Sequence, residues 1–182
     1  MTSAAHRSER ALAELACAAL PARAQPRLLV GGLGMGFTLR AALDALPARA
    51  RVLVAELNPV VVEWCRGPLS DLTDAAVDDP RVRVETTDVA EVVARAARKR
   101  AHGFDRILLD LYQGPAGDDD PHFGRDALGE LGRALREGGA LAVWSERAEP
   151  RFERRLVRAG LRFERHRPGR GGLRHAVYIA RP

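Results

Sequence analysis

A cluster of glycines constrains the fold of this chain more than any other feature. The short apolar run 28–30 leads directly into four of them, Gly31, Gly32, Gly34 and Gly36. An amphipathic helical pattern follows over residues 37–46. This order predicts a strand, a tight turn and a helix N-terminus, which is how α/β proteins hold a nucleotide-like ligand at the carboxyl end of a sheet. Because glycine lacks Cβ, the turn can adopt positive φ and approach a ligand closely.

The spacing of these glycines narrows the class of ligand. Phe37 stands where the third glycine of the dinucleotide fingerprint G-x-G-x-x-G would lie, and no Gly-Lys-Ser/Thr follows, which excludes a nucleoside-triphosphate loop. The G-x-G-x-G pattern after a first strand resembles the nucleoside loop of S-adenosylmethionine-dependent methyltransferases. Taken alone, the pattern is equally compatible with a plain strand-to-helix turn.

The rest of the chain alternates between strand and helix patterns. We predict strands at 27–30, 51–56, 82–85, 104–110 and 140–144, and helices at 37–46, 59–66, 90–100, 126–137 and 149–159. Gly138 and Gly139 are predicted to cap the helix 126–137. Two last strands, 161–166 and 175–180, are too close for a crossover helix and should be antiparallel. The prediction is an α/β, Rossmann-like class I methyltransferase fold, a seven-stranded, mostly parallel sheet with an antiparallel C-terminal hairpin and helices on both faces.

Composition limits the remaining possibilities. The 182 residues, 46% of them hydrophobic, suit one domain. We expect an N-terminal helical segment at 1–25 and an S-adenosylmethionine-binding, methyltransferase-like domain at 26–182. No apolar run approaches the ~20 residues of a membrane span, and the N-terminus has no secretory pattern. We therefore expect a cytoplasmic protein without membrane contact. The two cysteines and five histidines show no metal-ligand spacing.

The positive charge of the chain is spread along it. The net charge is +5, and almost all of the cationic residues are arginines interleaved with acids. The densest run, 95–100, has no aromatic residues within it. A nucleic-acid partner is therefore ranked low, and a small-molecule acceptor is preferred.

Acidic residues follow three of the predicted strands. Glu56 is placed to accept hydrogen bonds from ribose hydroxyls, or to favour the N-terminus of the next helix. Asp88 is placed to accept from an adenine amino group, or to cap the helix at 90–100. Asp110 faces the crevice where the strand order should reverse, and is the candidate for positioning an amine or acting as general base.

Neighbouring residues complete the candidate site. The cofactor-binding set comprises the four glycines with Glu56, Leu57, Asp88, Val89 and Asp110. The catalytic set comprises Asp110, Tyr112 and Gln113, the last two shaping the acceptor pocket. No metal is expected.

Four segments in order resemble the spermidine synthase group. They are 28–36 (LLVGGLGMG), 54–59 (VAELNP), 79–84 (DPRVRV) leading to Asp88, and 105–110 (DRILLD). The resemblance implies an adenosyl donor on the first three segments, and it implies that Asp110 serves as base toward an attacking amine.

The chain also differs from that group. Its glycine loop lacks the usual acid of G-G-G-D-G, and residues 110–115 (DLYQGP) keep the first acid of D-S-[ST]-D-P but lose the second. We therefore expect methyl transfer from S-adenosyl-L-methionine first. Aminopropyl transfer from decarboxylated S-adenosylmethionine to a diamine is the alternative, and a non-catalytic adenosyl-binding module is a third. The acceptor site would be completed by residues 1–25 or by a second subunit of a homo-oligomer.

Overall fold

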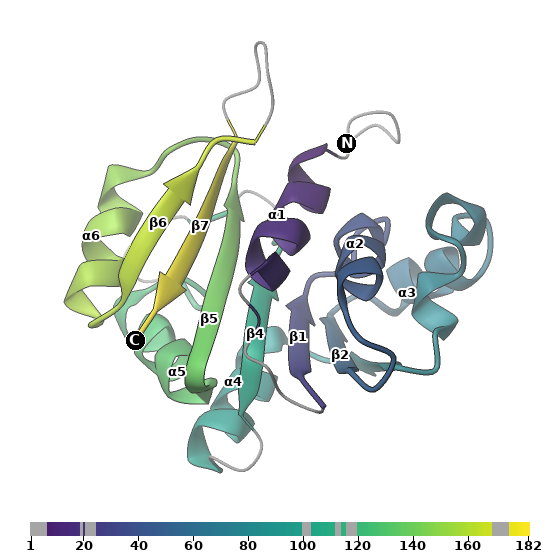
Figure 1. The fold of residues 1–182 in the computed structure, drawn as a ribbon, viewed down its shortest axis with the longest axis horizontal. Helices are drawn as coiled ribbons and strands as arrows, with labels where there is room; N and C mark the ends of the chain where they lie inside the picture. The colour runs from purple at the N-terminus through teal and green to yellow at the C-terminus, as the bar shows by residue number, and fades with distance from the viewer. Residues whose placement is uncertain are drawn as a thin grey trace.

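A seven-stranded sheet forms the centre of the protein (Figure 1). The computed structural model describes residues 7–18, 20, 25–99, 103–111, 114–115, 120–168 and 175–182. The strands are β1 (Arg27–Gly31), β2 (Arg51–Glu56), β3 (Val82–Thr86), β4 (Phe104–Leu109), β5 (Leu135–Ser145), β6 (Arg162–His166) and β7 (Ala176–Arg181). Their order is β3-β2-β1-β4-β5-β7-β6, and only the pairings of β7 are antiparallel. The predicted fold class is confirmed.

Helices cover both faces of this sheet. They are α1 (Arg7–Ala18), α2 (Phe37–Ala45), α3 (Pro59–Arg66), α4 (Val89–Arg98), α5 (Arg125–Ala134) and α6 (Pro150–Arg158), with short 3-10 turns at Ser70–Thr73 and Ala76–Asp78. The first three helices pack into one hydrophobic core and the last three into another, with the sheet between them. The 3-10 turns lie between the predicted helix 59–66 and the predicted strand 82–85, where the sequence analysis predicts no element.

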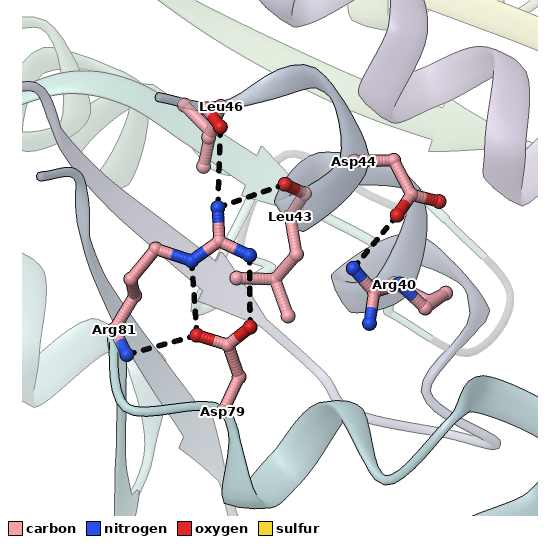
Figure 2. Close-up of polar contacts among 6 residues, drawn as sticks. All are labelled: Arg40, Leu43, Asp44, Leu46, Asp79 and Arg81. Atoms are coloured by element: carbon pink, nitrogen blue, oxygen red, sulfur yellow. Dashed lines mark hydrogen bonds and ion pairs between the residues drawn. The ribbon is translucent and has the colours of Figure 1, made fainter. Parts of the chain in front are cut away.

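Local side-chain contacts set several helix ends. Asn58 is the N-cap of α3 and accepts a hydrogen bond from Val60 N at 3.0 Å. At the C-terminal end of α2, Arg81 donates hydrogen bonds to the carbonyl oxygens of Leu43 (2.9 Å) and Leu46 (3.1 Å) (Figure 2). The same guanidinium forms a two-pronged ion pair with Asp79. The 79–84 segment thus serves the fold by satisfying carbonyls that the end of α2 leaves open.

The boundary between α5 and β5 differs from the prediction. The helix ends at Ala134, and Leu135 already pairs with Phe104 of β4. The register then shifts, so that Ala140 pairs with Arg106 and the intervening residues bulge. Gly138 lies inside this bulge at a φ of 73° and does not cap a helix. The predicted cap at Gly138 and Gly139 is therefore wrong, because pairing with β4 prevails over the helical pattern of residues 135–137.

The helix α1 belongs to the same core as α2. Leu12, Ala13 and Ala16 are buried there, and the Ala16 carbonyl accepts a hydrogen bond from the buried Arg106 of β4. Within the described part of the chain, no helix is long and apolar enough to cross a membrane.

Candidate functional site

The strand order brings the predicted acids to one edge of the sheet. From β1 the chain continues to β2 and β3 on one side, and then crosses to β4 and β5 on the other side of β1. The strand order therefore reverses at β1, and open α/β sheets bind ligands at the carboxyl ends of the strands at such a reversal point. Backbone pairing continues past the strands: Gly32 N donates to Ala55 O, and Asp110 N donates to Gly31 O, each at 3.0 Å. The glycine loop and Asp110 are therefore held side by side at the reversal point.

Two glycines of the loop are required by close packing. A Cβ on Gly31 would lie 2.7 Å from side-chain atoms of both Leu109 and Val89. Gly32 has a φ of 84°, and a Cβ there would lie 2.6 Å from the Asp110 carbonyl oxygen. Gly34 and Gly36 also have positive φ, of 52° and 82°. At these glycines the loop therefore presents backbone alone to the reversal point.

Glu56 braces the glycine loop from the end of β2. One carboxylate oxygen accepts a hydrogen bond from Leu33 N at 2.8 Å, and the other accepts from Asn58 N at 2.9 Å. A carboxylate has about four acceptor sites, so Glu56 keeps capacity for two ribose hydroxyls. Beside it, the side chain of Leu57 is 69% exposed.

Asp88 is the N-cap of α4. Its Oδ1 accepts from Ala90 N at 2.8 Å and lies 2.8 Å from Nε2 of His122. Partial burial alone would raise its pKa, but the hydrogen bonds from Ala90 and His122 hold the pKa below its usual value. The capping interpretation is confirmed, while contact with an adenine stays a prediction. Val89 is buried against Gly31, so it can support the loop from beneath.

Asp110 has an environment that suits proton transfer. Its Oδ2 accepts a hydrogen bond of 2.6 Å from the Thr38 hydroxyl, at the start of α2. Burial raises the pKa of Asp110 to about 6, the Thr38 hydrogen bond opposes this rise, and the negative charge of Glu9 adds to it. A carboxylate with this pKa is largely ionised at neutral pH and is a stronger base than an ordinary aspartate.

Sequence reasoning missed Glu9, which α1 brings close to Asp110. Glu9 is only 6% exposed, and its carboxylate accepts a hydrogen bond of 2.7 Å from the Ser8 hydroxyl. The Ser8 oxygen lies 2.8 Å from Nδ1 of His175. Since the single Ser8 proton is given to Glu9, Nδ1 of His175 is the donor of that contact. The signal in the sequence is an acid on the apolar face of the predicted N-terminal helix. Only the fold shows that this face brings the acid close to Asp110.

Two of the predicted catalytic residues, Tyr112 and Gln113, lie outside the described residues. Among the residues that are described, no group of three or more His, Cys, Asp or Glu side chains is arranged to hold a metal ion. The described site therefore consists of the glycine loop, Glu56, Asp88 and Asp110.

A sequence model of the spermine/spermidine synthase domain matches residues 6–162, most of the chain. The chain belongs to the spermine/spermidine synthase family. The resemblance drawn from four segments is thereby confirmed. Two curated members, the polyamine aminopropyltransferase of Mycobacterium tuberculosis and polyamine aminopropyltransferase 1 of Hyperthermus butylicus, are each 34% identical over 64% of this chain. The chain spans only 22% and 40% of the length of these family members.

Solved structures agree with the fold. The spermidine synthase of Thermotoga maritima superimposes with a TM-score of 0.73 at 21% identity, over 97% of this chain and 60% of that one. Human methyltransferase-like protein 13 superimposes with a TM-score of 0.66 at 16% identity, over 98% of this chain and 81% of that one. At these identities the likeness supports the methyltransferase-type fold that the family shares.

Proposed function

We propose that this chain transfers an aminopropyl group from decarboxylated S-adenosylmethionine to a small amine. The observation that carries the proposal is the placement of Asp110, with its raised pKa, at the reversal point of a sheet in a spermine/spermidine synthase family member. The family match favours this alternative over the methyl transfer that the sequence analysis ranked first.

The carboxyl edge of the sheet suits an adenosyl donor. A Cβ at position 32 would overlap the Asp110 backbone, so the residue there is glycine. Because Gly32 has no side chain, the donor can approach the loop backbone closely. Glu56 retains acceptor sites for ribose hydroxyls, and the exposed Leu57 beside it offers an apolar surface for the base. The donor itself supplies a carbon activated by the neighbouring sulfonium, so the protein chiefly has to align the amine with that carbon.

The acidic surroundings of Asp110 suit an amine acceptor. Asp110 and Glu9 are close enough for the charge of Glu9 to raise the pKa of Asp110. A cationic amine placed beside Asp110 relieves this repulsion, whereas the carboxylate tail of S-adenosylmethionine would add to it. Glu9 thus provides from α1 a second negative charge, which the 110–115 segment lacks.

The transfer step balances with Asp110 as the base. An acceptor that arrives as an ammonium ion has no free electron pair on its nitrogen, so the Asp110 carboxylate first accepts one of its protons. The neutral amine nitrogen then forms a bond to the aminopropyl carbon, and the bond from that carbon to sulfur breaks to release neutral methylthioadenosine. The product is a secondary ammonium ion, so the positive charge that sulfur loses is kept on nitrogen. Thr38 holds Oδ2 of Asp110 by a 2.6 Å hydrogen bond, so the other oxygen is the one that takes this proton.

The test is formation of methylthioadenosine from decarboxylated S-adenosylmethionine and a panel of mono- and diamines. Asp110→Asn should lower turnover by a factor of about 100 or more, in the range of general-base effects, and should lower donor affinity by calorimetry by a much smaller factor. Asp126→Asn, which changes an exposed aspartate of α5, is the matched control and should leave both quantities unchanged. Methylthioadenosine formation that is unaffected by Asp110→Asn would refute the role of this residue. Methyl transfer from S-adenosylmethionine in its place would refute the reaction itself.

A further inference from the structure

A large basic groove lies at the opposite edge of the sheet from the candidate donor site. It has a volume of about 1320 Å³ and runs along the amino ends of β1, β2 and β3 and beside α4. Nine of its described lining residues are arginine or lysine, and one, Glu85, is acidic. Ordinary small-molecule pockets are about 300–1,000 Å³, so the groove is large for a metabolite and is open enough for a polymer.

The strand register explains how the cations come together. Arg27 of β1 pairs with Arg51 of β2, and Leu53 of β2 pairs with Arg83 of β3. Residues two apart in a strand share a face, so all three arginines point to the same side of the sheet. This is the side on which α4 lies, and Arg95 of α4 and Lys99, the residue directly after it, also line the groove.

Several of these cations already have structural partners. Arg81 is committed to Asp79 and to the end of α2 (Figure 2). Arg83 and Arg95 share Glu85, and Arg136 forms an ion pair of 3.1 Å with Asp105. These residues shape the groove and add to its positive potential, but their side chains are already held in place.

Four other cations of the groove remain available to a ligand. Within the described residues no ion pair involves Arg49, Arg51, Arg98 or Lys99, and all four are exposed. The crowding of positive charge is visible at Arg27, whose pKa is lowered first by burial and then by the charges of Arg136 and Arg51. An anion in the groove would relieve this repulsion.

We propose that this groove binds the phosphodiester backbone of a single nucleic-acid strand. A strand carries a regular series of phosphates along an extended path, which matches cations supplied in turn by neighbouring strands and a helix. Arginine, which predominates here, forms two-pronged hydrogen bonds to phosphate. Among the lining residues that the structure describes, the one aromatic residue is Phe104, which is 2% exposed and cannot stack on bases. Binding is therefore through the backbone, independent of base sequence and sensitive to salt.

This inference concerns a surface remote from the proposed transfer site and does not depend on the transfer activity. It is tested by fluorescence anisotropy of the protein with a labelled single-stranded 20-mer of mixed sequence, as RNA and as DNA. Release of counterions from four phosphate contacts predicts that affinity falls about 50-fold between 50 and 200 mM salt. Equal binding of RNA and DNA is expected, since no contact to the sugar is required.

Two double variants, each lacking two positive charges, distinguish binding in the groove from attraction of the oligonucleotide to the net charge of the protein. Arg51→Gln with Lys99→Gln should reduce the salt effect to about 7-fold, because two contacts remain. Arg154→Gln with Arg158→Gln removes the same charge from exposed positions of α6, outside the groove, and should retain the full salt effect.

Three results would overturn the proposal. Equal weakening by the two pairs would mean attraction to net charge alone. Displacement of the oligonucleotide by an equal charge concentration of polyglutamate would mean that the groove accepts acidic proteins. Absence of binding at 50 mM salt would mean that it holds no strand. Unchanged donor-induced stabilisation in both pairs shows that the variants are folded and that the opposite edge is intact.

Discussion

Asp110 is the residue on which the proposed chemistry depends, and its environment is built by side chains distant in sequence. Thr38 at the start of α2 fixes one carboxylate oxygen, and Glu9 on α1 adds negative charge nearby. Burial is the largest cause of the raised pKa of Asp110, so the surrounding fold, more than any single partner, makes this aspartate a better base.

Changing Glu9 should shift the pH dependence of the reaction. With a pKa of about 6, Asp110 loses activity as pH falls through 6, because the protonated form cannot accept a proton. Glu9→Gln removes a charge that raises this pKa, so the acidic limb of kcat/KM should move to lower pH. Glu14→Gln, which alters an exposed acid of the same helix, should leave the limb in place. An acidic limb that moves to higher pH in Glu9→Gln would contradict this account.

The sequence predicts the acids of the site but not their partners. Glu56, Asp88 and Asp110 follow strands, and strand ends are readable from apolar runs and spacing. The proximity of Glu9 to Asp110 depends on how α1 packs over the sheet, which no local pattern encodes. Tyr112 and Gln113 remain predictions.

At the scale of elements, the turn from β1 to α2 needs positions that combine a positive φ with no room for a Cβ. Gly32 illustrates both requirements, since its φ is 84° and its Cβ position is blocked by the Asp110 carbonyl. Gly160 has a similar φ of 79°, with no atom within 4 Å of its Cβ position. A substitution at Gly160 therefore measures backbone strain alone, while one at Gly32 measures backbone strain together with steric overlap.

Gly32→Ala should be more destabilising than Gly160→Ala. A left-handed conformation costs a residue with a Cβ about 1–2 kcal/mol, and this is the full cost expected at Gly160. At Gly32 the overlap adds to it, so we expect a loss of about 3 kcal/mol or more in urea unfolding. Donor binding should be lost in Gly32→Ala and kept in Gly160→Ala. Equal losses of stability in the two variants would contradict the steric overlap between a Cβ at position 32 and the Asp110 carbonyl oxygen.

The stabilising effect of the Arg81–Asp79 clamp, in which Asp79 holds the guanidinium of Arg81 against the end of α2, should be lost in acid. Hydrogen bonds from Arg81 lower the pKa of Asp79 from 3.8 to about 2, against the opposing effect of burial. A lowered pKa stabilises the fold at higher pH, and this stabilisation is lost as pH falls from about 4 toward 2. Asp79→Asn should therefore cost about 2 kcal/mol at pH 7 and about half of that at pH 3.

The control for this prediction is the neighbouring aspartate. Asp78 and Arg66 form an ion pair in which both side chains are 55% exposed, so Asp78→Asn should cost less than about 1 kcal/mol at either pH. A larger loss from Asp78→Asn than from Asp79→Asn in urea unfolding would contradict the assignment of the clamp (Figure 2).

Element boundaries are predictable where local and tertiary preferences agree. The strand β2 and the helix α3 have the predicted bounds, because an apolar run and an Asn-Pro start mark them clearly. The start of β5 is wrong in the prediction, because residues 135–137 have a helical pattern but an available strand partner in β4. Pairing across the sheet is a tertiary effect that a local pattern does not contain.

At the scale of the whole molecule, the sheet presents chemically opposite edges. Acidic side chains and the glycine loop occupy the carboxyl edge, while cations gather at the amino edge. The sequence predicts the first edge from motifs. The second cannot be read from it, because its arginines are dispersed along the chain and interleaved with acids. Only the strand register brings Arg27, Arg51 and Arg83 onto one face.

The most direct test of the central claim compares four ligands in thermal unfolding. They are decarboxylated S-adenosylmethionine, methylthioadenosine, S-adenosylmethionine and S-adenosylhomocysteine at equal concentration. A ligand at a hundred times its Kd stabilises the folded state by about 2.7 kcal/mol, so differences in affinity appear as differences in Tm. We predict greater stabilisation by the first two, because their tails carry no carboxylate to meet Asp110 and Glu9. Greater stabilisation by the two carboxylate-bearing ligands would contradict aminopropyl transfer and support a methyltransferase.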